Sequence, residues 1–190
     1  MDETSNLLKY LFEVGQLKYV KRSGWWLAKV KDPESVAEHS FRTAILAYVI
    51  AKRENSPNPE KTCLKALLHD MHETRLLDKH KVASNYSKTS KEIERKVEAE
   101  QCKLLGDAGK EVYDLLGQED VIAKDADYLE AAITAKEYFD AGHKDAFDWI
   151  QRVSKVLKTK TAKELCALLT TSDSNVWWQG LKEDVEQLKY

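Results

Sequence analysis

The stretch CLKALLHDMHET, residues 63–74, combines the pattern of a packed helix with three neighbouring polar side chains. On a helix of about 3.6 residues per turn, four apolar residues form one stripe: Leu64, Leu67, Leu68 and Met71. The opposite side carries His69, Asp70 and Glu73, and the only small residue near them is Ala66. We therefore expect one helix that packs its apolar stripe into a core and presents its polar side to a pocket.

Helices are predicted along almost the whole chain. Only 7 glycines and 3 prolines interrupt the 190 residues, and no alternating strand pattern persists. The expected helices cover about residues 5–20, 32–53, 63–73, 89–105, 121–139, 145–157 and 161–169, with a last one around Trp177 and Trp178. The sequence thus predicts a single compact all-α domain over residues 1–190.

Composition and charge argue against several classes of protein. The formal net charge of −2 gives no electrostatic reason to bind nucleic acid, and no apolar run approaches the roughly 20 residues of a membrane span. The acidic start MDETSNLLKYLF lacks the basic region of a signal peptide. The three cysteines, Cys63, Cys102 and Cys166, form no CxxC pair, and an odd number of them without a secretory start indicates reduced thiols. We expect a soluble, cytoplasmic protein.

His69 and Asp70 are the first candidate metal ligands. Neutral imidazole nitrogen and carboxylate oxygen suit Zn, Mn, Fe, Co or Ni, although such a pair also occurs as a helix cap or a surface ion pair. His39 is the natural third ligand, because it lies on an apolar helix face, where the alternative is a satisfied core histidine. That helix is expected to begin near Pro33 in DPESVAEHS, residues 32–40.

A fourth ligand is expected from a carboxylate on the segment AKDADYLEAA, residues 123–132. Asp127 shares a helix face with three residues, two of them small: Ala123, Glu130 and Ala131. Asp125 lies toward a more apolar set: Val121, Ile122 and Leu129. Helical periodicity alone leaves both aspartates open.

These motifs together resemble the HD phosphohydrolase superfamily. A His, then an HD pair, then a distal Asp on a helical chain is its general pattern. The segments GWWLAKVKDPESVAEHS (24–40), LLHDMHE (67–73) and AKDADYLEA (123–131) are similar to the branch that contains the 5′-deoxynucleotidases. The similarity covers about residues 5–140, and the helices expected over about 141–190 offer little to match.

The resemblance implies one divalent transition metal (Mn, Co, Ni, Zn or Fe) with four ligands: His39, His69, Asp70 and Asp127. It favours Asp127 over Asp125. It also implies catalytic roles for Glu73, as the acid/base residue, and for Asp70, which would orient the attacking water.

The resemblance further assigns three substrate-binding residues: Arg22, Trp25 and Asp78. Asp78 would face the sugar, and Trp25 would contact the substrate or simply pack in the core. The bacterial enzymes carry an arginine directly before this tryptophan, where the present chain has Gly24. Arg22, three residues before Trp25, would supply the phosphate contact instead.

The implied activity is removal of the 5′-phosphate from nucleoside monophosphates, with deoxyribonucleoside 5′-monophosphates preferred. Two alternatives stay open: an HD phosphohydrolase acting on a triphosphate or cyclic nucleotide, and a non-catalytic protein that binds a nucleotide or metal. Relatives in this branch are commonly dimers, so the resemblance also implies a homodimer. No nucleic-acid or membrane partner is expected.

Overall fold

The computed structural model describes residues 2–181 and is helical throughout, without a β-strand in that range. The α-helices are α1 (Glu3–Gly15), α2 (Val36–Arg53), α3 (Pro59–Leu68), α4 (Glu73–Leu76), α5 (Lys81–Ser84), α6 (Lys91–Cys102), α7 (Ala108–Gly117), α8 (Val121–Asp140), α9 (Phe147–Val153) and α10 (Lys160–Leu169). Short 3-10 turns are η1 (Gln16–Lys18), η2 (Ser23–Ala28), η3 (Lys103–Leu105) and η4 (Lys144–Ala146). The predicted all-α class is confirmed.

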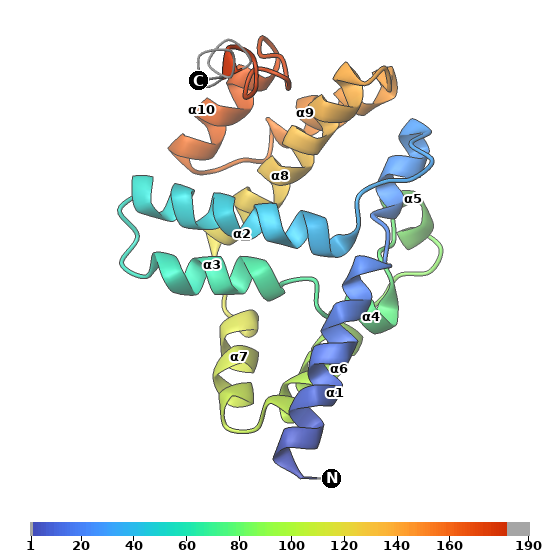
Figure 1. Ribbon diagram of the computed structural model, residues 1–190, viewed down its shortest axis with the longest axis vertical. Coiled ribbons are helices and arrows are strands. Elements are labelled where there is room, and N and C mark those ends of the chain that lie inside the picture. The colour runs from blue at the N-terminus through green and yellow to red at the C-terminus, as the bar shows by residue number, and fades with distance from the viewer. Residues whose placement is uncertain (1, 182–190) are drawn as a thin grey trace, which may run out of the picture.

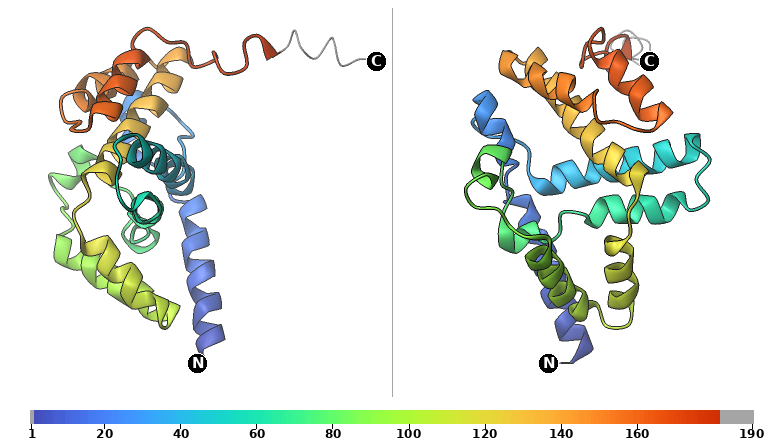
Figure 2. Two further views of the ribbon diagram at one scale, coloured as in Figure 1. Left: turned by 90° about the vertical axis from the view of Figure 1, so that its left-hand side faces the viewer. Right: turned by 180° about the vertical axis from the view of Figure 1, so that it is seen from behind.

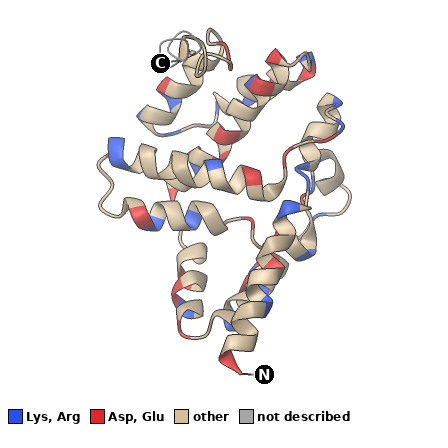
Figure 3. Cartoon of the chain, viewed as in Figure 1, with Lys and Arg blue, Asp and Glu red and all other residues tan. Residues whose placement is uncertain are grey.

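Helices α2 and α3 form an antiparallel pair across the middle of the molecule, and α8 crosses behind them (Figure 1). Helices α9 and α10 lie at one end of α8, while α1, α6 and α7 lie on the other side of the α2–α3 pair. Charged residues of both signs are scattered over these elements (Figure 3). None of the described helices is both long and apolar enough to cross a membrane.

Small side chains let α2 and α8 approach closely. Ala47 on α2 and Ala126 and Ala132 on α8 are fully buried, and they pack with the larger Ile50 and Leu129 in the main core. Truncating a buried side chain such as Leu129 to alanine costs about 2–5 kcal/mol. This close packing holds the N-terminal half of α2 beside the first two turns of α8, where the candidate ligands lie.

Helix α2 begins later than the sequence suggested, at Val36 rather than near Pro33. Ser35 is its N-cap: the Ser35 hydroxyl accepts from the Glu38 N–H at 3.2 Å, and the Glu38 carboxylate accepts from the Ser35 N–H at 2.6 Å. This reciprocal capping box fixes the helix start. Glu34 therefore precedes the helix, and its carboxylate accepts a hydrogen bond from the Trp25 indole at 2.9 Å.

The helix predicted over residues 63–73 ends at Leu68, and a turn separates it from α4. The expected apolar stripe is also only half correct. Leu64 and Leu67 are 39% and 42% exposed, whereas Met71 is buried with Leu68 beside it in a second cluster. The prediction failed because α3 turns its small residue Ala66 inward, against the closely packed α2–α8 pair.

Three other differences concern element boundaries. The first helix ends at Gly15, before η1, and α7 occupies a segment for which no helix was predicted. Around Trp177 the chain forms turns rather than the expected terminal helix, and residues 172–181 lead away from the helices (Figure 2). The rest of that expected helix, residues 182–190, lies outside the described residues.

Candidate active site

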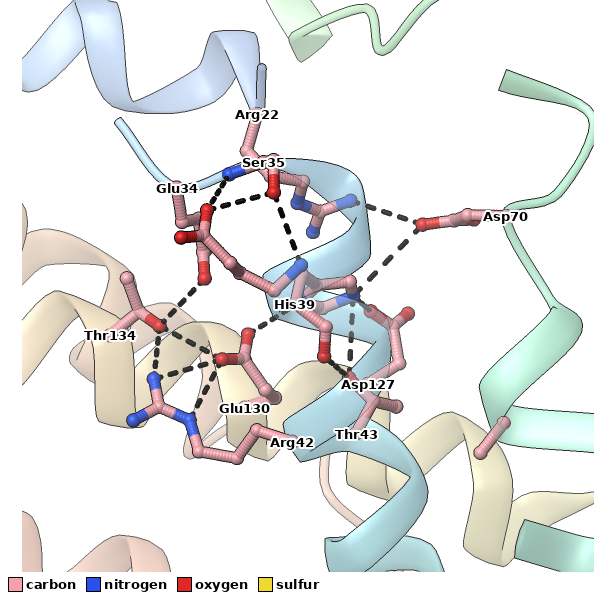
Figure 4. Close-up of polar contacts among 12 residues, drawn as sticks. Arg22, Glu34, Ser35, His39, Arg42, Thr43, Asp70, Asp127, Glu130 and Thr134 are labelled. Carbon is pink, nitrogen blue, oxygen red and sulfur yellow. Dashed lines mark hydrogen bonds and ion pairs between the residues drawn. The ribbon is translucent and has the colours of Figure 1, made fainter. Parts of the chain in front are cut away.

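The four predicted metal ligands meet where α2, the turn after α3, and α8 converge. His39 Nε2 lies 3.2 Å from Asp127 Oδ1 and 4.0 Å from Asp70 Oδ2. His69 Nε2 lies 3.1 Å from the same Asp70 oxygen and 3.7 Å from Asp127 Oδ1. Figure 4 shows His39, Asp70 and Asp127 pointing toward one another from three separate segments.

Hydrogen bonds orient both histidine rings so that Nε2 of each ring faces the centre of the ligand cluster. His69 Nδ1 lies 2.7 Å from the Ala66 carbonyl, which can only accept, so Nδ1 carries the proton. His39 Nδ1 lies 2.5 Å from Glu130 Oε2. With Nδ1 occupied in this way, Nε2 of each imidazole is the atom available for a metal.

The donor set fits a divalent transition metal. One ligand atom each from His39, His69 and Asp70 lies within 4.8 Å of the others, and imidazole with carboxylate is a common combination for such metals. His69 Nε2 is buried and has no hydrogen-bond partner among the described residues. A buried polar atom left in this state needs a ligand to compensate its lost hydration.

The electrostatics of the metal-free cluster favour the ionised forms. Burial lowers the pKa of His69, but the Asp70 and Asp127 carboxylates outweigh that effect and raise it well above its usual range. Burial raises the pKa of Asp127, but the neighbouring imidazoles of His39 and His69 hold it well below its usual range. A divalent cation would replace the protons on these imidazoles and retain both carboxylates as anions.

The structure separates the two aspartates that periodicity left open. Asp125 points to the other side of α8, where its carboxylate accepts from the Lys158 N–H at 2.9 Å and the Thr159 N–H at 2.6 Å. The Thr159 hydroxyl also donates to it at 2.7 Å. Thr159 is the N-cap of α10, so Asp125 anchors α10 onto α8 whereas Asp127 faces the histidines.

Arg22 reaches the cluster from the segment before η2. Its Nη1 lies 3.2 Å from Asp70 Oδ2 and 3.4 Å from Asp78 Oδ1. Asp78 also accepts from the Ser23 N–H at 2.5 Å, which ties the loop after α4 to η2. Burial lowers the pKa of Arg22, but the neighbouring carboxylates, Asp70 first among them, raise it above its ordinary value. This guanidinium is a permanent cation at the edge of the site.

Glu73, the first residue of α4, is a buried acid beside the cluster. Its Oε2 is buried without a hydrogen-bond partner among the described residues. Burial, followed by the negative charges of Asp70 and Asp78, raises the pKa of Glu73 to about 9. In the metal-free protein Glu73 therefore holds a proton at neutral pH and can donate it.

Comparison with known proteins agrees with this geometry. A family model described as HD domain matches residues 14–169, beyond the region of about 5–140 that the motifs alone suggested. The chain belongs to the HD-domain family. It is 35% identical to the 5′-deoxynucleotidase HDDC2 of Danio rerio over 142 residues, which are 70% of this chain and 70% of that protein.

Solved HD-domain structures share the fold. The crystal structure of genomics APC5600 superimposes with a TM-score of 0.75 at 35% identity and covers 92% of this chain and 99% of its own. The cyanophage S-2L HD phosphohydrolase DatZ, bound to dA and one catalytic Zn²⁺ ion, superimposes with a TM-score of 0.54. At 18% identity over 84% of this chain and 91% of DatZ, that likeness concerns the fold alone.

Trp25 lies deeper in this HD domain than a substrate contact would suggest. It is 3% exposed, its indole N–H donates to Glu34, and its ring packs edge-on against Tyr138 and beside Trp149, with ring centroids 5.2 Å apart in both cases. In this structure Trp25 therefore joins η2 to the C-terminal helices. Its role in substrate binding stays a prediction.

Glu130 is the HD-domain site residue whose role the sequence analysis missed. It is fully buried on α8, one turn after Asp127, and contacts His39, Arg42 and Thr134. Burial raises the pKa of Glu130, but the hydrogen bond with His39 and the charge of Arg42 hold it below its usual range. The sequence did contain a signal for this role, because Glu130 lies on the same helix face as the candidate ligand Asp127. The sequence analysis noted Glu130 only as a neighbour of Asp127.

Proposed function

We propose that this protein is a metal-dependent phosphohydrolase that removes the 5′-phosphate from nucleoside monophosphates, with deoxyribonucleoside 5′-monophosphates preferred. The observation that carries the proposal is the meeting of two imidazoles and two carboxylates beside a buried carboxyl group, Glu73, and a cation, Arg22. The similarity to a 5′-deoxynucleotidase over most of both chains supports the substrate class.

In this proposal four residues would hold one divalent transition metal, Mn, Co, Ni, Zn or Fe: His39, His69, Asp70 and Asp127. Such a metal, when bound, polarises a phosphate oxygen and lowers the pKa of the attacking water. Asp70 orients that water by accepting one of its hydrogen bonds, and Arg22 clamps two phosphate oxygens with its planar fork of donors.

Glu73 supplies the proton that the reaction requires. Water attacks phosphorus, the bond between phosphorus and the 5′ oxygen breaks, and Glu73 gives its proton to the leaving 5′ oxygen. A proton from the attacking water then restores Glu73 before the next turnover. The products are a nucleoside and inorganic phosphate.

The sugar and base are assigned to the side of the site formed by the loop after α4. Asp78 would accept a hydrogen bond from a sugar hydroxyl, and the buried Trp25 would seal the pocket. A cavity of about 270 Å³ adjoins Glu73 there, lined among others by His72, Leu76 and Lys79. This space could receive part of the nucleoside.

A homodimer is part of the proposal. Large apolar side chains stay exposed on three helices: Leu8, Leu11 and Phe12 on α1, Phe41, Ile45 and Val49 on α2, and Leu64 and Leu67 on α3. Exposed apolar surface of this kind favours a protein interface. Light scattering coupled to size exclusion would show twice the chain mass of 21.8 kDa, and a monomer at micromolar concentration would contradict it.

A cytoplasmic location is the remaining part of the proposal. All three cysteines are free thiols in the structure, and free thiols are typical of a reducing compartment. Fractionation of the native protein would test this assignment.

The substrate class is tested by phosphate release from 5′-dNMPs, NMPs, dNTPs and cyclic nucleotides in the presence of Mn, Co, Ni, Zn or Mg. Release from dNMPs above NMPs is the expected result. Turnover of triphosphates or cyclic nucleotides alone would overturn the assigned substrate while keeping the site. Metal binding without turnover of any substrate would overturn the enzymatic role.

A further inference from the structure

The Glu130 carboxylate divides its two oxygens between two different tasks. Oε2 lies 2.5 Å from His39 Nδ1, while Oε1 accepts from Arg42 Nε at 3.0 Å and from the Thr134 hydroxyl at 2.9 Å. Both Glu130 and His39 are fully buried. Figure 4 shows the arrangement, with His39 between Glu130 on one side and Asp127 and Asp70 on the other.

We propose that Glu130 is a positioning residue for the metal centre: it holds the proton of His39 on Nδ1, so that the lone pair of Nε2 faces the metal. A carboxylate that accepts from the far side of a ligating imidazole fixes the orientation of the ring and makes it a stronger ligand. The inference rests on the proposed metal site and adds a residue that does not itself bind the metal.

Arg42 explains how an anion can be kept at this buried position. Its guanidinium lies 2.9 Å from Glu130 Oε1 and also pairs with both oxygens of Glu137, at 2.5 and 3.0 Å. The Arg42 side chain is 31% exposed, so water still reaches it. Arg42 therefore balances the charge of Glu130 and leaves Oε2 to His39. Without Glu130 it would still have Glu137 and solvent.

Glutamine at position 130 cannot perform both tasks. If its amide oxygen faces His39, its NH2 group faces the donors of Arg42. If the oxygen faces Arg42 instead, the NH2 group faces His39 Nδ1, which must then accept, and the proton moves to Nε2, where it blocks metal binding. Either arrangement weakens metal binding, whereas a purely structural role for Glu130 predicts a change in fold stability alone.

The test compares Glu130→Gln with the matched control Glu137→Gln, which removes a partner of Arg42 but does not touch His39. Dissociation constants for Zn²⁺ are measured by competition with a chromophoric chelator, and Co²⁺ absorption spectra are recorded for both variants. We expect about 10–100-fold weaker metal binding and an altered Co²⁺ spectrum for Glu130→Gln, and parent-like values for Glu137→Gln. Parent-like affinity in a folded Glu130→Gln variant would overturn the inference.

A second measurement covers the case in which Glu130→Gln fails to fold. In the zinc-loaded parent protein, long-range ¹H–¹⁵N correlations identify which nitrogen of His39 carries the proton. A protonated, strongly deshielded Nδ1 with metal-bound Nε2 is expected, and the opposite assignment would refute the inference. Failure of the parent protein to bind any metal would instead refute the proposed function, so the two failures can be told apart.

Discussion

Asp125 and Asp127 are two residues apart on α8, yet their removal should have different effects. Loss of Asp125 should mainly lower stability, whereas loss of Asp127 should mainly abolish metal binding and activity. In Asp125→Ala the Lys158 N–H, the Thr159 N–H and the Thr159 hydroxyl all lose their acceptor. Each unsatisfied, partly buried donor costs about 1 kcal/mol at the lower end of the usual range, so the free energy of unfolding should fall by about 3 kcal/mol. For a domain of this size that corresponds to roughly 10 °C in Tm.

Asp127→Ala should leave the fold nearly intact and remove a metal ligand. The Asp127 side chain is 29% exposed, and its contacts in the metal-free protein are with His39 and His69, which can lose their protons when the carboxylate is gone. The expected loss of stability is about 1 kcal/mol, whereas phosphate release and tight metal binding should both disappear.

The assay pairs urea unfolding of the metal-free variants with phosphate release measured well below the Tm of each. Asp125→Ala should be the less stable variant and should retain turnover while it is folded. The reasoning would be refuted by an Asp125→Ala variant that is stable but inactive, or by an Asp127→Ala variant that still binds metal and turns over substrate.

Three further predictions follow from the same structure. In the metal-free protein, Glu73 has a pKa of about 9 against an ordinary value of 4.5. Between these two pKa values the folded state holds a proton that the unfolded state releases. This residue therefore makes the free energy of unfolding fall as the pH rises from 4.5 to about 9. Glu73→Gln should make the unfolding free energy fall less between pH 5 and pH 8, by about 4 kcal/mol, and identical pH profiles would contradict this. Arg22→Lys loses the planar fork, so KM for a monophosphate should rise about tenfold, whereas an unchanged KM in steady-state kinetics would remove Arg22 from phosphate binding. Ser35→Ala removes half of the capping box of α2 and should cost about 1 kcal/mol in thermal unfolding, and an unchanged Tm would show that the cap is unimportant.

The sequence was most informative where side-chain chemistry and helical periodicity agreed. His39 was predicted to lie on a buried face of one helix, and the structure buries it completely. His69 and Asp70 were predicted to face one pocket together, and both lie within 4 Å of another predicted ligand. The choice between Asp125 and Asp127 needed the packing of α10, which helical periodicity within α8 does not contain.

Other features could not be predicted because they depend on contacts between distant segments. Helix α3 ends at Leu68, whereas its sequence alone continues the helical pattern to Glu73. Glu130 is buried as an anion because His39 and Arg42, both on another helix, contact it. The burial of Trp25 likewise depends on Tyr138 and Trp149, more than a hundred residues away in the chain.

The most direct test of the account is hydrolysis of a deoxyribonucleoside 5′-monophosphate by the chelated protein as one divalent transition metal is added back, with Asp70→Asn as the matched control. We predict no phosphate release without metal, full activity at one equivalent per chain, and none in the variant at any metal concentration. Hydrolysis by the metal-free protein, or undiminished hydrolysis by Asp70→Asn, would contradict a mechanism centred on His39, His69, Asp70 and Asp127.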